Sequence, residues 1–273
     1  MSILIFFIGC AHSTTQLKFN IASEERIWLD KFFKDLLLEE SGIYTLWGSK
    51  PMVCFEICLY SSEELKKLQE EIEENTHVEK VMIKNYDFPE NWEKWEKIRE
   101  QFKMSRFLLF KKEDPEEPKL PRVFFINILE TALTIQENYH FFKKVVGSDF
   151  DSLEVVFEIE KEDSKFWNAV LKNSELMGLL YGFGLKNASC FYWKCRKNQI
   201  EDHEFTKSLR YRFSAGQDVG YATIDSLPLP IFSTFFEDDQ IIHKYKAERE
   251  KIKKIYKNQD FVDVTLDRLM AEN

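Results

Sequence analysis

SEERIWLDKFFKDLLLEESGIYTLWGSKPMVCFEICLY, residues 23–60, decides the fold class of this chain. Its first half predicts a helix over Ser23–Ser41, in which Ser23 caps the N-terminus and Gly42 closes the C-terminus in the left-handed conformation. The apolar residues of this segment recur at helical spacing and form one apolar face, which consists of Ile27, Trp28, Phe32, Leu36 and Leu37.

The second half of the same stretch predicts two strands. Ile43–Trp47 has the composition of a strand, residues 48–51 (GSKP) are typical of a turn, and Met52–Tyr60 has the alternation of a second strand. We expect the two strands to pair as a hairpin. Helix and strand patterns thus occur side by side in one stretch, which favours an α+β fold.

The rest of the chain continues this mixture. A capping box formed by Ser61 and Glu64 predicts a helix from Ser61 to about Asn75, because each of the two residues can satisfy a backbone N–H of the other. Further patterns predict strands at Val78–Lys84, Arg106–Lys111 and Leu153–Glu160, and an extended loop at Ser226–Phe232. Helices are predicted at Pro89–Phe102, Leu129–Val146, Ser164–Leu180, Asn187–Lys197, Phe235–Lys257 and 261–270. The helix at Leu129–Val146 follows an apolar run that begins at Arg122 and is ended by Gly147.

The strongest break in the chain is Glu113–Pro118 (EDPEEP), whose prolines and acidic residues cannot continue a helix or a central strand. It divides an N-terminal α/β half, residues 21–112, from a helix-rich C-terminal half, residues 119–273. A long loop within one domain explains the break equally well. We therefore predict an α+β fold with helices packed on a small mixed or antiparallel sheet, as a single domain or as two loosely divided halves.

Composition excludes some classes of protein. The 273 residues are 44% hydrophobic and 31% charged, which is typical of a folded domain. A net charge of −9 argues against a nucleic-acid partner and against broad electrostatic adhesion to anionic lipid, since both need a concentrated positive surface. No stretch approaches the ~20 apolar residues of a transmembrane helix.

The N-terminal segment Ile3–Cys10 (ILIFFIGC) is a short apolar run that ends in Gly and Cys and is followed by polar residues. Over Phe7-Ile8-Gly9-Cys10 it resembles the end of a bacterial lipoprotein signal peptide. It departs from that family in two respects, because Phe7 stands where Leu is usual and no Lys or Arg precedes the apolar run. The resemblance implies a signal peptide over residues 1–9, diacylglyceryl attachment to the Cys10 thiol, and a polar linker over residues 10–20. The alternative is a buried first strand with Cys10 as a core thiol.

Two other segments resemble known sequences. Gly42–Met52 (GIYTLWGSKPM) and Met177–Lys194 (MGLLYGFGLKNASCFYWK) are similar to segments of uncharacterised proteins from intracellular Gram-negative bacteria. That group has no assigned activity, so this resemblance implies no site residues.

Four cysteines remain beside Cys10, and they suit either two disulfides or free buried thiols: Cys54, Cys58, Cys190 and Cys195. If the first two lie on one extended strand, they are ~13 Å apart, which is too far for them to bridge each other. Neither the C-x3-C nor the C-x4-C spacing matches a standard zinc or redox motif. We therefore expect no metal and no cofactor.

Candidate chemistry elsewhere is sparse. Folding could bring His140, with Glu137 nearby in sequence, to Cys190 as a Cys–His pair, although a buried, hydrogen-bonded His and an inert thiol are the simpler interpretation. Trp92 and Trp95 could stack on a sugar or aromatic ligand, and their simpler interpretation is core packing. The charged helix at Phe235–Lys257 is interpreted as a solvated surface helix, with partner binding as the alternative.

We therefore predict an envelope lipoprotein, in which a lipid on Cys10 anchors an acidic domain to the bacterial membrane on the periplasmic or outer-membrane side. Its role is expected to be a non-enzymatic interaction with another envelope protein, and no nucleic-acid partner is expected. The alternative is a soluble, cytoplasmic hydrolase-like enzyme with an unrecognised site. A third hypothesis is an intracellular structural protein.

Overall fold

A computed structural model describes residues 19, 21–61, 63, 64, 66, 67, 88–113, 117–196, 222–232, 234 and 239–272. The side chains of residues 190, 191 and 193–196 are not described. The predicted signal peptide with Cys10, the strand at Val78–Lys84 and most of the polar linker lie outside the described residues. Within them the structure contains eleven α-helices and three strands.

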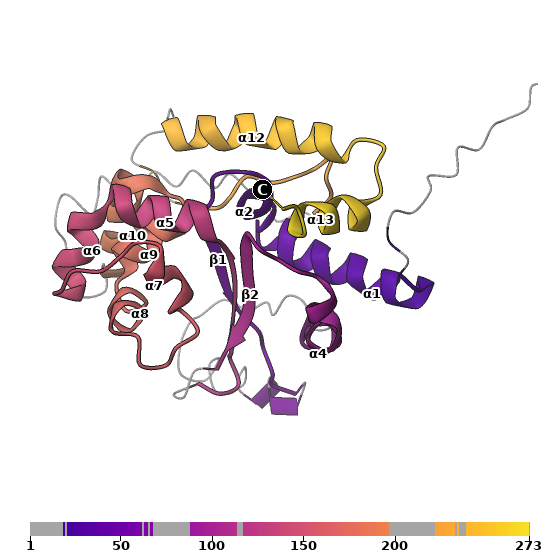
Figure 1. Ribbon diagram of the computed structural model, residues 1–273, viewed down its shortest axis with the longest axis horizontal. Coiled ribbons are helices and arrows are strands. Elements are labelled where there is room, and N and C mark those ends of the chain that lie inside the picture. Colours follow the sequence, from indigo (N-terminus) through magenta and orange to yellow (C-terminus); the bar gives the residue numbers. More distant parts are fainter. Residues whose placement is uncertain are drawn as a thin grey trace, which may run out of the picture.

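The centre of the fold is a three-stranded antiparallel sheet (Figure 1) made of β1 (Met52–Glu56), β2 (Phe107–Lys112) and β3 (Arg122–Asn127). The strand order is β1-β3-β2, so β3 lies in the middle and pairs with both neighbours. The predicted α+β class with a small antiparallel sheet is confirmed. The Glu113–Pro118 segment, of which residues 114–116 are not described, connects β2 to β3, and the sheet therefore includes strands from before and after it.

Alternate residues of the strands face two separate hydrophobic cores. On β3, Val123 and Phe125 belong to one core, whereas Phe124 and Ile126 belong to the other. Since side chains alternate between the two faces of a strand, each face of the sheet carries its own helical layer.

The first layer contains the N-terminal and C-terminal helices. It consists of α1 (Ser23–Lys34), which continues as a π-helix over Asp35–Glu39, α2 (Ile43–Trp47), α4 (Phe88–Ile98) with a following 3-10 turn at Arg99–Gln101, α12 (Gln240–Tyr256) and α13 (Phe261–Leu269). Arg26 of α1 joins the two ends of the described chain, because its Nη2 lies 2.6 Å from Asp260 Oδ1 and 2.7 Å from Asp263 Oδ1.

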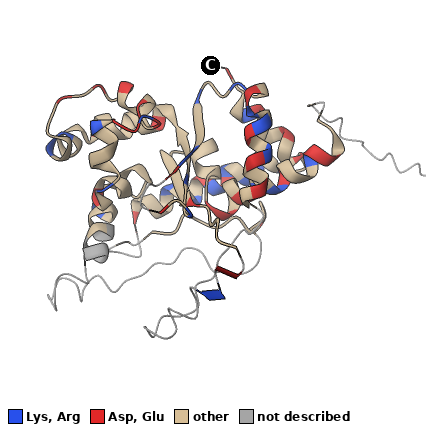
Figure 2. Ribbon diagram, turned by 90° about the horizontal axis from the view of Figure 1, so that it is seen from below, with Lys and Arg blue, Asp and Glu red and all other residues tan. Residues whose placement is uncertain are grey.

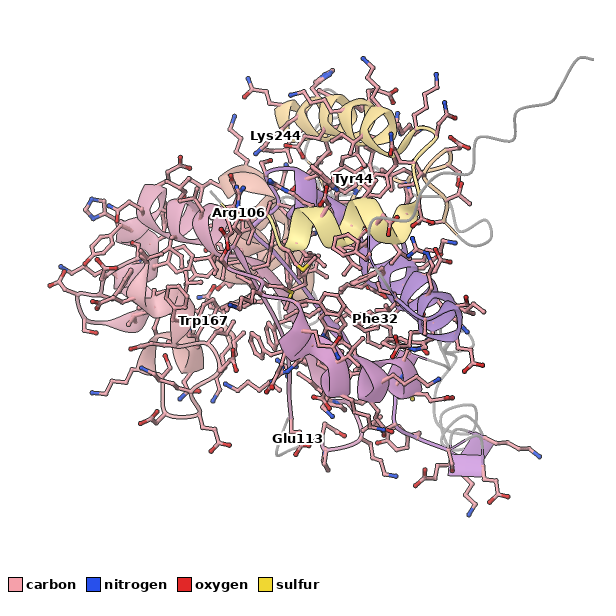
Figure 3. The ribbon with its side chains drawn as sticks, turned by 45° about the vertical axis from the view of Figure 1, so that its right-hand side comes forward. Phe32, Tyr44, Arg106, Glu113, Trp167 and Lys244 are labelled. Carbon is pink, nitrogen blue, oxygen red and sulfur yellow. The ribbon has the colours of Figure 1, made fainter. Side chains whose placement is uncertain are left out.

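The second layer is formed by six consecutive helices (Figure 1), namely α5 (Ile128–Glu137), α6 (Tyr139–Val146), α7 (Glu154–Phe157), α8 (Lys165–Val170), α9 (Ser174–Leu180) and α10 (Gly184–Arg196). Trp167 lies at its centre with no exposed surface, and its Nε1 donates to Val155 O at 2.6 Å. Figure 3 shows Trp167 and Phe32 on opposite sides of the sheet.

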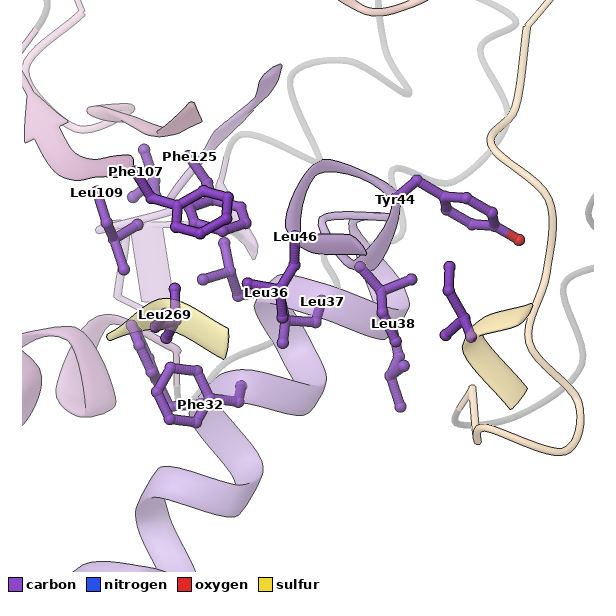
Figure 4. Packing of buried hydrophobic residues seen from close by; sticks show 14 of the residues in the cluster. Phe32, Leu36, Leu37, Leu38, Tyr44, Leu46, Phe107, Leu109, Phe125 and Leu269 are labelled. Atoms are coloured by element: carbon purple, nitrogen blue, oxygen red, sulfur yellow. The ribbon is translucent and has the colours of Figure 1, made fainter. Parts of the chain in front are cut away.

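Aromatic residues fill the first core. The Phe32 ring stacks on Phe88 and on Trp95, each with a centroid separation of 5.3 Å, and it lies near the aliphatic side chains of the π-helix (Figure 4). Trp92 and Trp95 are 1% and 0% exposed. Their interpretation as core residues is therefore confirmed, and a ligand cannot stack on them in this structure.

The predicted strand at Ile43–Trp47 is wrong, because this segment forms the helix α2, and the hairpin predicted with it does not exist. The N–H groups of Thr45 and Leu46 donate to Gly42 O at 3.0 and 2.9 Å. Four of the five α2 residues are buried, so the segment lacks the polar face that usually identifies a helix. Strand β1 pairs with β3 instead.

The predicted strand at Leu153–Glu160 is also wrong. Asp151 Oδ1 accepts hydrogen bonds from the N–H groups of Leu153 and Glu154 at 2.8 and 2.9 Å, and this cap starts the short helix α7. The single helix predicted at Ser164–Leu180 is divided into α8 and α9. The division occurs at Asn173, whose Oδ1 accepts from two N–H groups at the start of α9.

Helix ends were predicted with mixed success. Ser23 does not cap α1, which is preceded by Ala22 without a side-chain cap, and the left-handed residue before α2 is Ser41 (φ 61°) instead of Gly42. Gly147 does end α6 in the left-handed conformation (φ 79°). The Ser61–Glu64 capping box is confirmed: Ser61 N donates to Glu64 Oε2 at 2.7 Å, and Glu64 N donates to Ser61 Oγ at 3.2 Å.

Candidate functional site

The candidate site is a cleft of about 340 Å³ between the outer strand β1 and the second helical layer. Strands β1 and β3 form one side of it, and α9 with the residues just after α8 and α9 forms the other. Its lining consists of Cys54, Phe55, Glu56, Arg122, Leu171, Met177 and Tyr181. The apolar and polar walls together suit a small amphipathic molecule.

The inner end of the cleft holds a thiol and a phenol that contact each other. Burial raises the pKa of the Cys54 thiol to about 12, and a hydrogen bond with the Tyr181 side chain does not offset this effect. Burial also raises the pKa of the Tyr181 hydroxyl. At neutral pH the thiol is therefore protonated, and since the thiolate is the reactive form, Cys54 is a poor nucleophile.

The rim of the cleft carries one acidic and one basic side chain. Glu56 and Arg122 are direct partners in the register of β1 and β3, and Arg122 Nε lies 3.9 Å from Glu56 Oε1. The two side chains are 57% and 36% exposed. The sheet register therefore sets opposite charges side by side at the entrance, where a charged ligand meets both.

Lys50 lies next to the cleft, on the chain segment between α2 and β1. It is 6% exposed, and its Nζ donates to Tyr181 O at 3.3 Å. The ammonium also lies 5.9 Å from the centre of the Tyr181 ring and 6.0 Å from that of Phe183. Burial lowers the pKa of Lys50 to about 8, although Glu40 acts in the opposite direction. Tyr181 thus contacts the buried amine through its carbonyl and the thiol through its hydroxyl.

Helix α12 fixes the backbone around Lys50. Tyr245 Oη donates to Gly182 O at 3.0 Å, directly after the carbonyl that Lys50 contacts. Glu248 Oε1 accepts from Ser49 N at 3.2 Å and from Ser49 Oγ at 2.6 Å. Burial raises the pKa of Glu248. Helix α12 therefore fixes two backbone segments beside the buried amine: Ser49, which precedes Lys50 in sequence, and Gly182, which follows the carbonyl that Lys50 contacts.

The residues singled out from sequence do not meet at this site. His140 and Glu137 are exposed, so the interpretation of His140 as a buried histidine is wrong. The Cys190 and Cys195 side chains lie outside the described part of the structure. Cys54 and Cys58 are free thiols. Cys10 lies outside the described residues, and its lipidation stays a prediction.

Lys50 and Tyr181 were not predicted from the sequence as site residues. Lys50 lies in the GSKP segment that is typical of a turn, and Tyr181 lies directly after the helix predicted at Ser164–Leu180. Lys50 belongs to the segment Gly42–Met52 and Tyr181 to the segment Met177–Lys194. Nothing in either segment indicated that they touch.

Among the residues that the structure describes, no three His, Cys, Asp or Glu side chains are grouped in a way that could hold a metal ion. In the same part of the chain, no helix is long and apolar enough to cross a membrane.

Fold and site together define an α+β domain with a small cleft at the edge of its sheet and a buried lysine beside that cleft. Comparison with protein-family models, curated proteins and solved structures finds no match for this chain.

Proposed function

We propose that this protein is a lipid-anchored protein of the bacterial envelope, whose acidic domain acts through a non-enzymatic interaction with another protein. The anchor rests on the Phe7-Ile8-Gly9-Cys10 motif. The interaction role rests on one structural observation, which is the exposure of large apolar side chains on three consecutive helices of the second layer.

Each of these helices contributes to a pair of exposed apolar residues one turn apart. The pairs are Leu129 and Leu133 on α5, Phe141 and Val145 on α6, and Phe157 of α7 with Leu153 directly before that helix, all between 38% and 57% exposed. Helices α5 and α7 are joined by a hydrogen bond of 2.9 Å from Ser152 Oγ to Gln136 Oε1. Large exposed apolar residues on neighbouring helices are typical of protein interaction sites.

The cleft supports the same role better than it supports bond cleavage. Its only cysteine is a neutral thiol with a pKa of about 12. Neither of the two histidines that the structure describes, His140 and His243, lines the cleft. A soluble hydrolase-like enzyme remains the alternative, and the cleft is the feature that favours it.

Metabolic labelling with a clickable palmitate analogue tests the anchor. Wild-type protein is expected to carry the label and to sediment with membranes, whereas Cys10→Ala loses both properties. Cys58→Ala is the matched control, because Cys58 is a free, partly exposed thiol that does not belong to the motif. Label that persists in Cys10→Ala, or wild-type protein without label, would contradict the proposal.

Site-specific photo-crosslinking in cells tests the interaction. A benzophenone amino acid at Leu133 or Phe157 is expected to give the same discrete protein adduct, because both positions lie on the exposed apolar pairs. The control places the same amino acid at Lys97, an exposed residue of α4 in the other layer. Equal adducts at all three positions, or none at Leu133 and Phe157, would refute the interaction role.

A further inference from the structure

Helix α12 has a buried side and a strongly basic exposed side. Ile242, Tyr245, Ile252 and Tyr256 are buried in the first core. The helix lies along the outside of the molecule (Figure 1), and Figure 3 shows long side chains that project outward from it. The exposed lysines of this helix and of the residue that follows it are Lys244, Lys246, Lys251, Lys254 and Lys257.

The charge of α12 differs in sign from that of the whole chain. Its 17 residues contain six Lys or Arg and two Glu, a net charge of +4, so the rest of the chain carries −13. On the side of the molecule away from α12, acidic and basic residues are interspersed (Figure 2). The net charge of −9 therefore hides one basic surface.

The two acidic residues of α12 have hydrogen-bond or ion-pair partners other than the three lysines of the proposal, although the charge of Lys244 acts on Glu248 in the direction that lowers its pKa. Glu248 accepts from Ser49, and Glu250 Oε1 lies 3.3 Å from Arg249 Nε. Within the described residues, Lys244, Lys251 and Lys254 have no carboxylate within 4 Å. These three ammonium groups are spread over about 15 Å of helix, at a rise of ~1.5 Å per residue. They are accordingly available to an external anion.

We propose that this exposed face of α12, presented by Lys244, Lys251 and Lys254, docks on a membrane surface that contains anionic phospholipid. Lysine is a point charge that suits phosphate groups. Reading of nucleic-acid bases uses Arg, Asn and Gln. Besides its lysines, α12 offers exposed Gln240 at its first position and Arg249, which pairs with Glu250, so lysine is the main charged group of the outward face.

The proposal deepens the proposed function, since the lipid on Cys10 would hold the domain near the membrane and a basic patch adds a second, electrostatic contact with it. It rests on the proposed function only in assigning the membrane to the bacterial envelope. Docking through α12 would also hold the domain in one orientation, with the exposed apolar pairs of the second layer at a fixed position relative to the membrane.

Vesicle co-sedimentation tests the docking without the lipid anchor. The full chain carrying Cys10→Ala is mixed with phosphatidylcholine vesicles that contain either no phosphatidylglycerol or about 30% of it, at about 50 mM and about 500 mM salt. We expect binding only to the anionic vesicles and a loss of this binding at high salt. Because the protein carries no lipid, the result does not depend on the labelling experiment with Cys10.

The variant Lys244→Gln/Lys251→Gln/Lys254→Gln is expected to bind anionic vesicles at least tenfold more weakly, on the order of the contribution of a few lysines near such a surface. The matched control is Lys97→Gln/Lys144→Gln/Lys165→Gln, which removes the same charge from exposed residues of other helices and should bind as the wild type does. Circular dichroism verifies that both variants fold. The proposal is overturned by equal losses in the two variants, by binding that ignores phosphatidylglycerol, or by tighter binding to duplex DNA than to the vesicles.

Discussion

Replacement of Lys50 by Met removes the most unusual charge in the described structure. Lys50 is 6% exposed, and its amine donates a hydrogen bond to Tyr181 O at 3.3 Å. Met has a side chain of similar length and no charge, so it fits the same space beside the Tyr181 and Phe183 rings. We expect the variant to fold and to be more stable than the wild type at neutral pH.

The magnitude follows from the pKa of Lys50, which burial lowers from 10.5 to about 8. Between pH 8 and 10.5 the unfolded chain holds a proton on this amine and the folded chain does not, so raising the pH stabilises the wild-type fold by ~1.4 kcal/mol per pH unit. Over the whole window the gain is about 3 kcal/mol. Below pH 8 both states are protonated, and the full cost of the buried charge is present.

The assay is urea unfolding of wild type, Lys50→Met and Lys97→Met at pH values from 7 to 10.5. Differences between variants are compared, because the other titrating groups then cancel. The free energy of unfolding of Lys50→Met should exceed that of the wild type by about 2 kcal/mol at pH 7, once a cost of ~1 kcal/mol for the lost hydrogen bond is allowed. This advantage should disappear at about pH 9.5, because the wild type gains ~1.4 kcal/mol per pH unit above pH 8. Lys97→Met, at an exposed position, should show no such trend. A pH-independent difference for Lys50→Met would refute the reasoning.

Three other predictions concern the fold and the cleft. Gly182→Ala should destabilise the protein by more than ~2 kcal/mol, because a Cβ there meets Tyr245 Oη and the residue has φ 78°. The control Gly147→Ala, with φ 79° and open space around it, should cost only the ~1 kcal/mol of backbone strain. Equal losses of the two variants in urea unfolding would contradict this prediction. Cys54 should react with iodoacetamide at pH 8 far more slowly in the native than in the urea-unfolded protein, and mass spectrometry that finds equal rates would show that its thiol is not protected. Asn127→Ala should cost ~1–2 kcal/mol in urea unfolding, since the side chain caps α5 through Glu130 N and donates to Thr45 O. A variant as stable as the wild type would show that these two hydrogen bonds contribute nothing.

The elements that were predictable from sequence are those with one buried and one solvated face. Helices α4, α12 and α13 lie within a few residues of their predicted positions, because their apolar residues repeat with the period of a helix. The helix α2 and the strand β3 are buried on nearly every side. Their sequences are almost continuously apolar, so no period distinguishes helix from strand, and only the tertiary structure decides between them.

The candidate site was not predictable for a different reason. Lys50 and Tyr181 are 131 residues apart in sequence, and each lies at a turn between elements whose relative position the sequence does not reveal. The raised pKa of Cys54 and the lowered pKa of Lys50 are both effects of burial by distant segments. Composition and local spacing give no information about such burial. They do reveal a short local motif such as Phe7-Ile8-Gly9-Cys10.

The link between Arg26 and the start of α13 has a consequence for the synthesis of this protein. The N-terminal helix α1 packs against α13, and Arg26 pairs with Asp260 and Asp263 across 234 and more positions of the chain. During translation the part of α1 that faces α13 therefore stays uncovered until residues 261–269 have left the ribosome. A ribosome that stalls before this point holds a chain whose first core cannot close, and such a chain is expected to depend on chaperones.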